Sequence, residues 1–310
     1  MARKARNRTL DYLQYLALRV VDMGIKVWPA GAALSAAAGL GDLMYRFDKK
    51  HRDRALANLA NSFPDMPLPR RQEMARLSMQ QLFMLFIEVL YTTRLIRLDS
   101  FRRHVELRNV SQTIRHMLDD KRGLIMLTGH YGNWEVLGYT LATLGFATTS
   151  VARPLDNPYV NDWLLGVRQR QGQRIIDKIG ATTEVGPILE AGGTVGFIAD
   201  QNAGPKGLFV DFFGRKASTY KSIGLLAMRY EVPVVVGYAR RTGRGFHFTV
   251  GTQDVIRPED WADEPDPLTY ITQRYTRAIE AFVKEDPGQY LWVHRRWKTR
   301  PKGETAMAFD

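Results

Sequence analysis

The segment from Thr128 to Glu135 contains the residues best suited to proton transfer. It reads Thr-Gly-His-Tyr-Gly-Asn-Trp-Glu and begins where the apolar run 124–128 ends. Histidine accepts and releases protons near neutral pH, and a carboxylate within reach can fix its tautomer and stabilise the imidazolium. We therefore predict that His130 is a general base and that Glu135 folds back across the turn to hold its ring. The alternative is a packed turn histidine, because this spacing by itself is common.

Several reaction classes are excluded by what the chain lacks. It has no cysteine, which removes thiolate nucleophiles, thiolate metal sites and disulfides. No Gly-x-Ser-x-Gly segment occurs, so a covalent acyl-enzyme has no evident nucleophile and the acceptor itself must attack. Walker, dinucleotide-glycine and His-Glu-x-x-His patterns are also missing. The remaining histidines show no metal-ligand spacing; they are His51, His104, His116, His247 and His294.

Three arginines follow the next apolar run. Arg153 comes directly after 147–152, and Arg168 and Arg170 lie on a predicted helix over 161–171. Each guanidinium could bind a phosphate bidentately or stabilise the oxyanion of a tetrahedral intermediate. A solvated or ion-paired surface role is the alternative for each of them.

A third polar cluster follows the run 194–199. Asp200 and Gln201 end this run, and Lys206 lies in the flexible turn after them. Asp200 could orient an arginine or a substrate, and the structural alternative is that it caps the turn.

The order of the predicted elements favours an α/β fold. Short apolar runs alternate with helical patterns after residue 123, which predicts a mostly parallel central sheet flanked by helices. In such sheets, sites form at the carboxyl ends of the strands. The predicted strands are 124–128, 147–152, 194–199, 233–239 and 246–250, and the predicted helices are 70–93, 134–144, 161–171 and 220–230.

The first 60 residues predict a membrane-associated helical segment, followed by a catalytic domain over 61–310. Basic residues precede an apolar run of 14 residues, 27–40, about 21 Å long as a helix. That is short of the roughly 30 Å hydrocarbon core, so an interfacial or re-entrant anchor fits better than a spanning helix. Trp28, Tyr45 and Phe47 would lie at headgroup depth. A buried helical hairpin is the alternative.

The net charge of +12 predicts an anionic partner, which could be nucleic acid, an anionic membrane leaflet, a phosphorylated lipid or an acidic carrier protein. The C-terminal stretch 289–301 interleaves aromatic and cationic residues. It would suit a membrane surface or nucleic acid, with a solvated basic tail as the alternative.

Taken together, these segments resemble the lysophospholipid acyltransferase superfamily. The resemblance is to the branch of late lipid A acyltransferases that add lauroyl or myristoyl chains. It runs over most of the chain and rests on separated motifs in the right order: Asn58-Leu59 with Phe63-Pro64, Gly129-His130 to Glu135, Arg153-Pro154 with Asn157-Pro158, Asp200-Gln201 with Gly204-Pro205-Lys206, Phe212-Phe213-Gly214, and Tyr290-Leu291-Trp292 through Lys298-Thr299-Arg300-Pro301.

The resemblance implies an enzyme on the cytoplasmic face of the inner membrane. It would take acyl groups from acyl carrier protein or coenzyme A and transfer them directly to a hydroxyl of an anionic lipid, a lipid A precursor, with no cofactor and no metal. By the same resemblance the catalytic residues are His130, Glu135, Arg168 and Asp200. The substrate-binding positions are Gly129, Asn133, Arg153, Arg170, Gln201 and Lys206.

Two departures from the family pattern leave the acceptor open. Asn202 stands where the pattern often has another acid, and Gly129 precedes the histidine in a Thr-Gly-His context. Related enzymes act on glycerophospholipids, inositol mannosides or amino-acid lipids. From another class, a basic nucleic-acid-binding or lipid-binding protein without catalysis fits the charge, although no nucleic-acid-binding module is recognisable and no such partner is expected.

Overall fold

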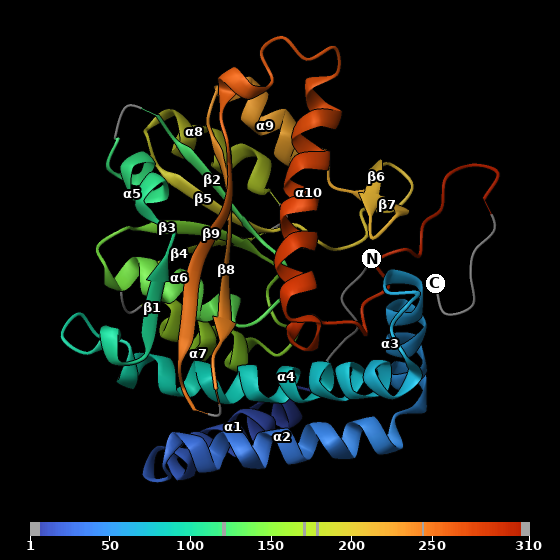
Figure 1. Ribbon diagram of the computed structural model, residues 1–310. Helices are drawn as coiled ribbons and strands as arrows, with labels where there is room; N and C mark the ends of the chain where they lie inside the picture. The colour runs from blue at the N-terminus through green and yellow to red at the C-terminus, as the bar shows by residue number, and fades with distance from the viewer. Residues whose placement is uncertain (1–6, 120–121, 170–171, 178–179, 244, 305–310) are drawn as a thin grey trace.

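A mostly parallel sheet lies at the centre of the protein in the computed structural model (Figure 1). The structure describes residues 7–119, 122–169, 172–177, 180–243 and 245–304. In spatial order the seven strands of this sheet are β1 (Val105–Arg108), β9 (Phe248–Ile256), β8 (Val234–Arg241), β2 (Leu124–Thr128), β5 (Thr194–Ile198), β3 (Thr148–Ala152) and β4 (Arg174–Asp177). The five strands from β8 to β4 are parallel, whereas β9 and β1 run in the opposite direction. This architecture confirms the predicted α/β class.

Helices cover both faces of the sheet. In the described part of the chain they are α1 (Arg8–Val27), α2 (Ala30–Phe47), α3 (Lys49–Ser62), α4 (Leu68–Leu95), α5 (Ser111–Leu118), α6 (Trp134–Thr143), α7 (Pro158–Gln169), α8 (Ala181–Glu190), α9 (Ser222–Tyr230) and α10 (Pro267–Glu285). Short 3₁₀ turns are η1 (Phe101–Arg103), η2 (Pro258–Asp260) and η3 (Pro287–Gln289), and a separate hairpin is formed by β6 (Leu208–Phe212) and β7 (Arg215–Thr219).

The central strand β2 is buried on both sides because its side chains alternate between two hydrophobic cores. Ile125 and Leu127 pack in one core with α8, α9 and α10. Leu124 and Met126 pack in the other with α6 and parts of α2 and α4. All five residues of β2 are buried, so the strand that precedes the candidate general base lies at the rigid centre of the molecule.

The N-terminal helices form a layer across one end of the sheet (Figure 1). The apolar run 27–40 is not one helix, because α1 ends before Trp28 and Pro29 begins a new direction for α2. The Tyr91 hydroxyl of α4 stabilises this corner by donating to the carbonyls of Ile25 and Trp28 at 2.6 and 2.9 Å. Among the described residues, no helix combines the length and hydropathy needed to cross a bilayer.

The C-terminal stretch is not a solvated tail. Tyr290, Trp292, Arg296 and Trp297 are each at most 2% exposed. The Asn58 side chain of α3 donates to the carbonyls of Trp292 and His294 at 2.8 and 3.1 Å. The aromatic residues of this stretch therefore build the core, and they do not present a stacking surface to nucleic acid or lipid.

A matched pair of substitutions on α2 tests how this helix packs. Leu34 is 1% exposed against the core and Leu40 is 53% exposed on the same helix. We expect Leu34→Ala to lower the free energy of unfolding by about 2–5 kcal/mol, because a buried cavity remains. Leu40→Ala should change it by no more than about 0.5 kcal/mol. Urea unfolding followed by circular dichroism measures both, and equal losses would contradict this packing.

Candidate active site

His130 and Asp200 lie side by side because they follow two neighbouring parallel strands. β2 pairs with β5 in register, Thr128 opposite Ile198, and the N–H of Ala199 donates to the carbonyl of Thr128 at 2.9 Å. The next residues of both strands leave the sheet at the same edge. There the Asp200 carboxylate accepts the backbone N–H of His130 at 2.8 Å and lies 2.6 Å from its Nδ1.

The charge state of Asp200 fixes the role of each ring nitrogen of His130. Asp200 is 2% exposed. Burial alone would raise its pKa, but the charge of His130 and the hydrogen bonds from it hold the pKa of Asp200 well below its ordinary value. An ionised carboxylate only accepts hydrogen bonds, so Nδ1 carries the proton. Nε2 is therefore the atom that can take a proton from a substrate.

Two rings and an amide surround the imidazole. The ring centroid of Trp134 lies 5.0 Å from that of His130, and that of His294 lies 4.4 Å away, both edge-on. The Nε2 of Gln201 lies 3.4 Å from the Nε2 of His130. The His130 side chain remains 12% exposed. Its reactive nitrogen is thus near a polar side chain in a site that is mostly shielded from water.

The structure gives Glu135 a different partner from the one predicted. Its carboxylate binds the guanidinium of Arg168 bidentately, with Arg168 Nε at 2.7 Å from one oxygen and Nη2 donating to the other. Trp134 Nε1 donates to the same carboxylate at 3.1 Å. The prediction that Glu135 holds the ring of His130 is therefore wrong. Glu135 lies in the first turn of α6 and faces α7, whereas the adjacent strand β5 delivers Asp200 to the ring.

The Glu135–Arg168 pair is largely shielded from solvent, with side chains 13% and 19% exposed. Burial by itself lowers the pKa of Arg168, but the charge of Glu135 raises it above its ordinary value. The guanidinium is thus a permanent, oriented cation near the end of β2.

The turn after His130 needs a glycine at position 132. Gly132 has a φ of +53°, and a Cβ there would lie 1.9 Å from the carbonyl oxygen of Ala239 in β8. Its N–H donates to the carbonyl of Gln289 at 3.0 Å. The next residue, Asn133, caps α6 by accepting the backbone N–H groups of Glu135 and Val136 at 3.0 Å.

A buried ion pair supports this turn from below. Glu88 of α4 is fully buried and accepts the Nδ2 of Asn133 at 2.7 Å. It also binds Arg241 of β8, and Arg241 in turn binds the side chain of Gln81. The Nε2 of Gln81 donates to the carbonyl of Gly132. Helix α4 and strand β8 therefore meet under the turn that carries the candidate base.

The other predicted substrate-binding residues have different positions. Gly129 packs against Asp200, and a Cβ on it would lie 3.3 Å from the carboxylate. Asn133 is fully buried as a helix cap, so its side chain positions the turn and does not face a substrate. Arg153 is 76% exposed and pairs with Asp156 at 3.1 Å, while Lys206 lies in an exposed turn. Arg170 lies outside the described residues.

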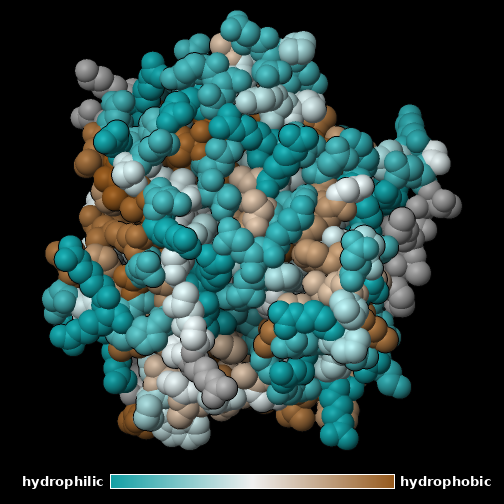
Figure 2. Space-filling model, in the orientation of Figure 1, coloured by the Kyte–Doolittle hydropathy of each residue, from teal (hydrophilic) through white to brown (hydrophobic). Residues whose placement is uncertain are grey.

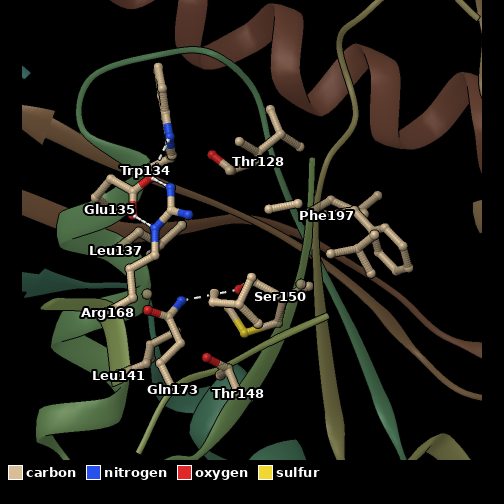
Figure 3. Close-up of a pocket in the computed structure, with 18 residues that line it drawn as sticks. Thr128, Trp134, Glu135, Leu137, Leu141, Thr148, Ser150, Arg168, Gln173 and Phe197 are labelled. Carbon is tan, nitrogen blue, oxygen red and sulfur yellow. Dashed lines mark hydrogen bonds and ion pairs between the residues drawn. The ribbon is translucent and has the colours of Figure 1, made fainter. Parts of the chain in front are cut away.

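An apolar cavity lies between α6 and the sheet, and it is lined by Trp134, whose ring contacts that of His130 (Figure 3). Thr128, Trp134 and the Glu135–Arg168 pair border one end, and the cavity continues between α6 and strands β2, β3 and β5. Its volume is about 90 Å³, several times the roughly 10–15 Å³ that one water molecule occupies by a comparable measure. A narrow apolar space of this kind suits a hydrocarbon chain.

The family follows from the match of the whole chain. Residues 2–299 match the model of the bacterial lipid A biosynthesis acyltransferases. The chain belongs to this family. The lipid A biosynthesis lauroyltransferase of Escherichia coli (strain K12) is 27% identical over 94% of this chain and 93% of its own length. The myristoyltransferase of the same strain is 26% identical over 91% and 85%. A lipid A biosynthesis acyltransferase of Haemophilus influenzae is 27% identical over 93% of each.

The protein is thus an acyltransferase of the lipid A biosynthesis type, which confirms the predicted enzyme class. Within the described ranges, no group of three histidine or acidic side chains is placed to hold a metal ion.

His294 is the site residue of this acyltransferase that the sequence did not reveal. Its ring contacts that of His130, although 164 positions separate the two in the chain. Burial, with the charge of His130 adding to it, lowers the pKa of His294 to about 4. The only signal in the sequence was the position of His294 within the aromatic-basic stretch 289–301, and histidine spacing alone did not connect it to the site.

His294 should make the acyltransferase sensitive to acid. The unfolded chain protonates this histidine near its ordinary pKa of about 6.5, whereas the folded chain does so near 4. Between these values the unfolded state binds more protons, so stability falls as pH falls. We expect His294→Gln to reduce the loss of unfolding free energy between about pH 8 and about pH 5 by about 1–2 kcal/mol. Urea unfolding at both pH values measures this, and identical pH dependence of the two proteins would contradict it.

Proposed function

We propose that the acyltransferase moves a fatty acyl chain from an acyl thioester to a hydroxyl of a lipid A precursor by direct transfer. The observation that carries the proposal is the His130–Asp200 pair, whose imidazole contacts the ring of Trp134, a residue that lines the apolar cavity. A histidine held by a buried carboxylate is a general base, and an adjoining apolar channel is a place for the chain that is transferred. The thioester comes from acyl carrier protein or coenzyme A.

In the proposed reaction, His130 Nε2 takes the proton of the acceptor hydroxyl while that oxygen attacks the thioester carbonyl. Asp200 stabilises the imidazolium that forms. The oxyanion of the tetrahedral intermediate is stabilised by the guanidinium of Arg168, which Glu135 holds in place. When the intermediate collapses, the carbon–sulfur bond breaks and the imidazolium returns its proton to the leaving thiolate. The products are an ester and a free thiol.

The proposed site of membrane contact is α1, because its exposed side is apolar. Six large apolar residues three or four positions apart form one exposed stripe, whereas Asp11 and Asp22 of the same helix are buried. This reverses the usual arrangement of a surface helix and suits insertion at the headgroup boundary. The members of the stripe are Leu10, Leu13, Leu16, Val20, Met23 and Val27.

Neighbouring residues of α2 and α3 extend this face. Phe47 is 71% exposed and lies beside Lys49 and Lys50 along a shallow apolar surface. Figure 2 shows hydrophobic residues among hydrophilic ones along the lower edge of the molecule, where α1 and α2 lie in Figure 1. Cations beside apolar side chains favour an anionic leaflet. We therefore propose that the first 60 residues dock the catalytic domain on the membrane without crossing it, on the cytoplasmic face where the donors are found.

Contacts between α1 and α7 support a link between the docking face and the site. The ring centroids of Tyr12 and Tyr159 lie 5.3 Å apart, and the Nδ2 of Asn157 donates to the carbonyl of Asp11 at 2.9 Å. The same helix α7 carries Arg168. A lipid acceptor held at the docking face would lie one helix away from the oxyanion cation.

Activity of four variants tests the reaction. We expect His130→Ala and Asp200→Asn each to lower kcat by about 10²–10⁴-fold, the usual contribution of a positioned general base. The double variant should lose no more than His130→Ala alone, because both residues act in one unit. His247→Ala, which removes an exposed histidine, should keep full activity. The assay mixes acyl-carrier-protein or coenzyme A thioesters with lipid A precursor, glycerophospholipid or other lipid acceptors, and mass spectrometry identifies the product.

Folding of each variant is checked by its melting temperature. Near-normal turnover by a folded His130→Ala protein would refute the proposed base. Transfer to a different lipid by the wild-type protein would keep the mechanism and replace the acceptor. No transfer by the wild-type protein to any acceptor would overturn the proposed function.

Flotation with vesicles tests the docking face. We expect the double substitution Leu13→Glu and Val20→Glu to lower the bound fraction on phosphatidylcholine–phosphatidylglycerol vesicles at least tenfold, because two charges would enter the apolar boundary. Leu118→Glu introduces a charge at an exposed leucine of α5, 69% exposed, and should bind as the wild type does. Equal binding by all three proteins would exclude α1 as the docking element.

A further inference from the structure

A polar cross-link lies part-way along the apolar cavity, between the Glu135–Arg168 pair on one side and Leu141 and Thr148 on the other (Figure 3). The Nε2 of Gln173 donates to the hydroxyl of Ser150 at 3.1 Å. Gln173 precedes β4 and is 6% exposed, and Ser150 lies in β3. The lining around the cross-link is made mostly of apolar side chains from α6 and the strands, among them Leu137, Leu141 and Phe197.

Two glycines make room for this cross-link. Gly138 of α6 and Gly196 of β5 both line the cavity. A Cβ on Gly138 would lie 2.5 Å from the Nε2 of Gln173, and a Cβ on Gly196 would lie 3.2 Å from the hydroxyl of Ser150. The side chains of Gln173 and Ser150 therefore occupy space that a side chain at position 138 or 196 would need.

A third polar group lies beyond the cross-link, two residues before Ser150 in β3. The hydroxyl of Thr148 borders the cavity and is buried, and it has no hydrogen-bond partner among the described residues. The apolar channel thus contains a polar section. Burial of hydrocarbon in the apolar part of the channel is favourable, whereas contact with the amide and the hydroxyls gives no such stabilisation.

We propose that the Gln173–Ser150 hydrogen bond crosses the acyl cavity and limits the length of chain that the enzyme transfers. This inference rests on the proposed function. A chain whose methyl end stops at the cross-link leaves the hydrogen bond intact. A longer chain must break it and leave a buried amide without a partner, which is disfavoured. A shorter chain leaves part of the cavity empty and loses contact with its walls. Gln173 and Ser150 are therefore residues that determine specificity, and they take no part in the proton transfer.

The test measures chain preference as a ratio. Wild-type protein and variants receive an equimolar mixture of saturated acyl thioesters that differ by two carbons, with one lipid acceptor, and mass spectrometry gives the relative kcat/KM of each chain. We expect Gln173→Ala to shift the preferred chain by at least one member toward longer chains. Its discrimination against the next longer chain should fall about tenfold or more, within the 10–200-fold range typical of a methylene-sized difference in an apolar pocket.

Substitution at the opposing glycine should act in the other direction. Gly138→Ala places a methyl group against Gln173 and narrows the cavity at the cross-link, so we expect a shift toward shorter chains. Gln169→Ala, at an exposed glutamine of α7, is the matched control and should keep the wild-type preference. Ser150→Ala removes the acceptor of the hydrogen bond without enlarging a side chain, and we expect it to weaken discrimination in the same direction as Gln173→Ala.

The outcomes separate this inference from the proposed function. If the wild-type protein transfers acyl chains and Gln173→Ala, Gly138→Ala and Ser150→Ala all keep its preference, the cross-link does not set chain length. If Gln173→Ala does not fold, as judged by its melting temperature, Gly138→Ala and Ser150→Ala decide. If the wild-type protein transfers no chain to any acceptor, the proposed function fails first and this inference fails with it.

Discussion

The site depends on the in-register pairing of β2 with β5. Two parallel strands that end together bring the residues that follow them to one point, so His130 meets Asp200 across 70 positions of sequence. A slip of one residue would turn one of these side chains to the opposite face of the sheet. The carboxylate is buried, and a buried charge without a partner is strongly destabilising. The ion pair therefore favours the same register that the apolar side chains of the two strands require.

A second buried pair, Glu88 with Arg241, holds the turn in place. This pair fixes the conformation of the turn more than it stabilises the fold, because desolvation of the two buried charges offsets much of their attraction. Glu88 binds Arg241 of β8 and the cap of α6, and Gln81 joins Arg241 to Gly132. Removing one member would leave the other charged and buried beneath the base. Long helix α4 thereby couples the N-terminal layer to the position of His130, and the same cap directs Glu135 toward Arg168.

The sequence predicted the α/β class and the main strands, because buried runs between turn residues carry a strong local signal. Strands β2, β3, β5, β8 and β9 were found within two residues at their starts. The missed strands β1, β4, β6 and β7 have only four or five residues each, and none stands out as an apolar run. The corner between α1 and α2 at Trp28 was missed as well. The apolar residues 27–40 suggested one continuous run, whereas α1 ends at Val27 and α2 begins after Pro29.

The pairing of the candidate site residues could not be predicted from the sequence. His130, Glu135, Arg168 and Asp200 were all named, yet nearness in sequence suggested Glu135 as the partner of His130. Which side chains pair depends on the order of the strands in the sheet, and no local sequence pattern indicates that β5 lies next to β2. His294 was missed for the same reason, because it reaches the ring through the folding of the C-terminal stretch into the core. Arg153 follows β3, and β5 lies between β3 and β2. This separation from the end of β2 explains why the side chain of Arg153 stays in solvent.

The arrangement of helices has a consequence for how the proposed substrates would meet. The cavity lies under α6, Arg168 comes from α7, and α7 packs on the apolar helix α1. In the proposed function, the acyl chain enters an apolar channel bordered by Trp134 and the Glu135–Arg168 pair, while the acceptor remains near the docking face of α1. Both reacting groups would then approach Nε2 from places where their hydrocarbon is out of water. A single helix, α7, separates those two places, so the position of Arg168 along it determines where thioester carbonyl and hydroxyl can meet.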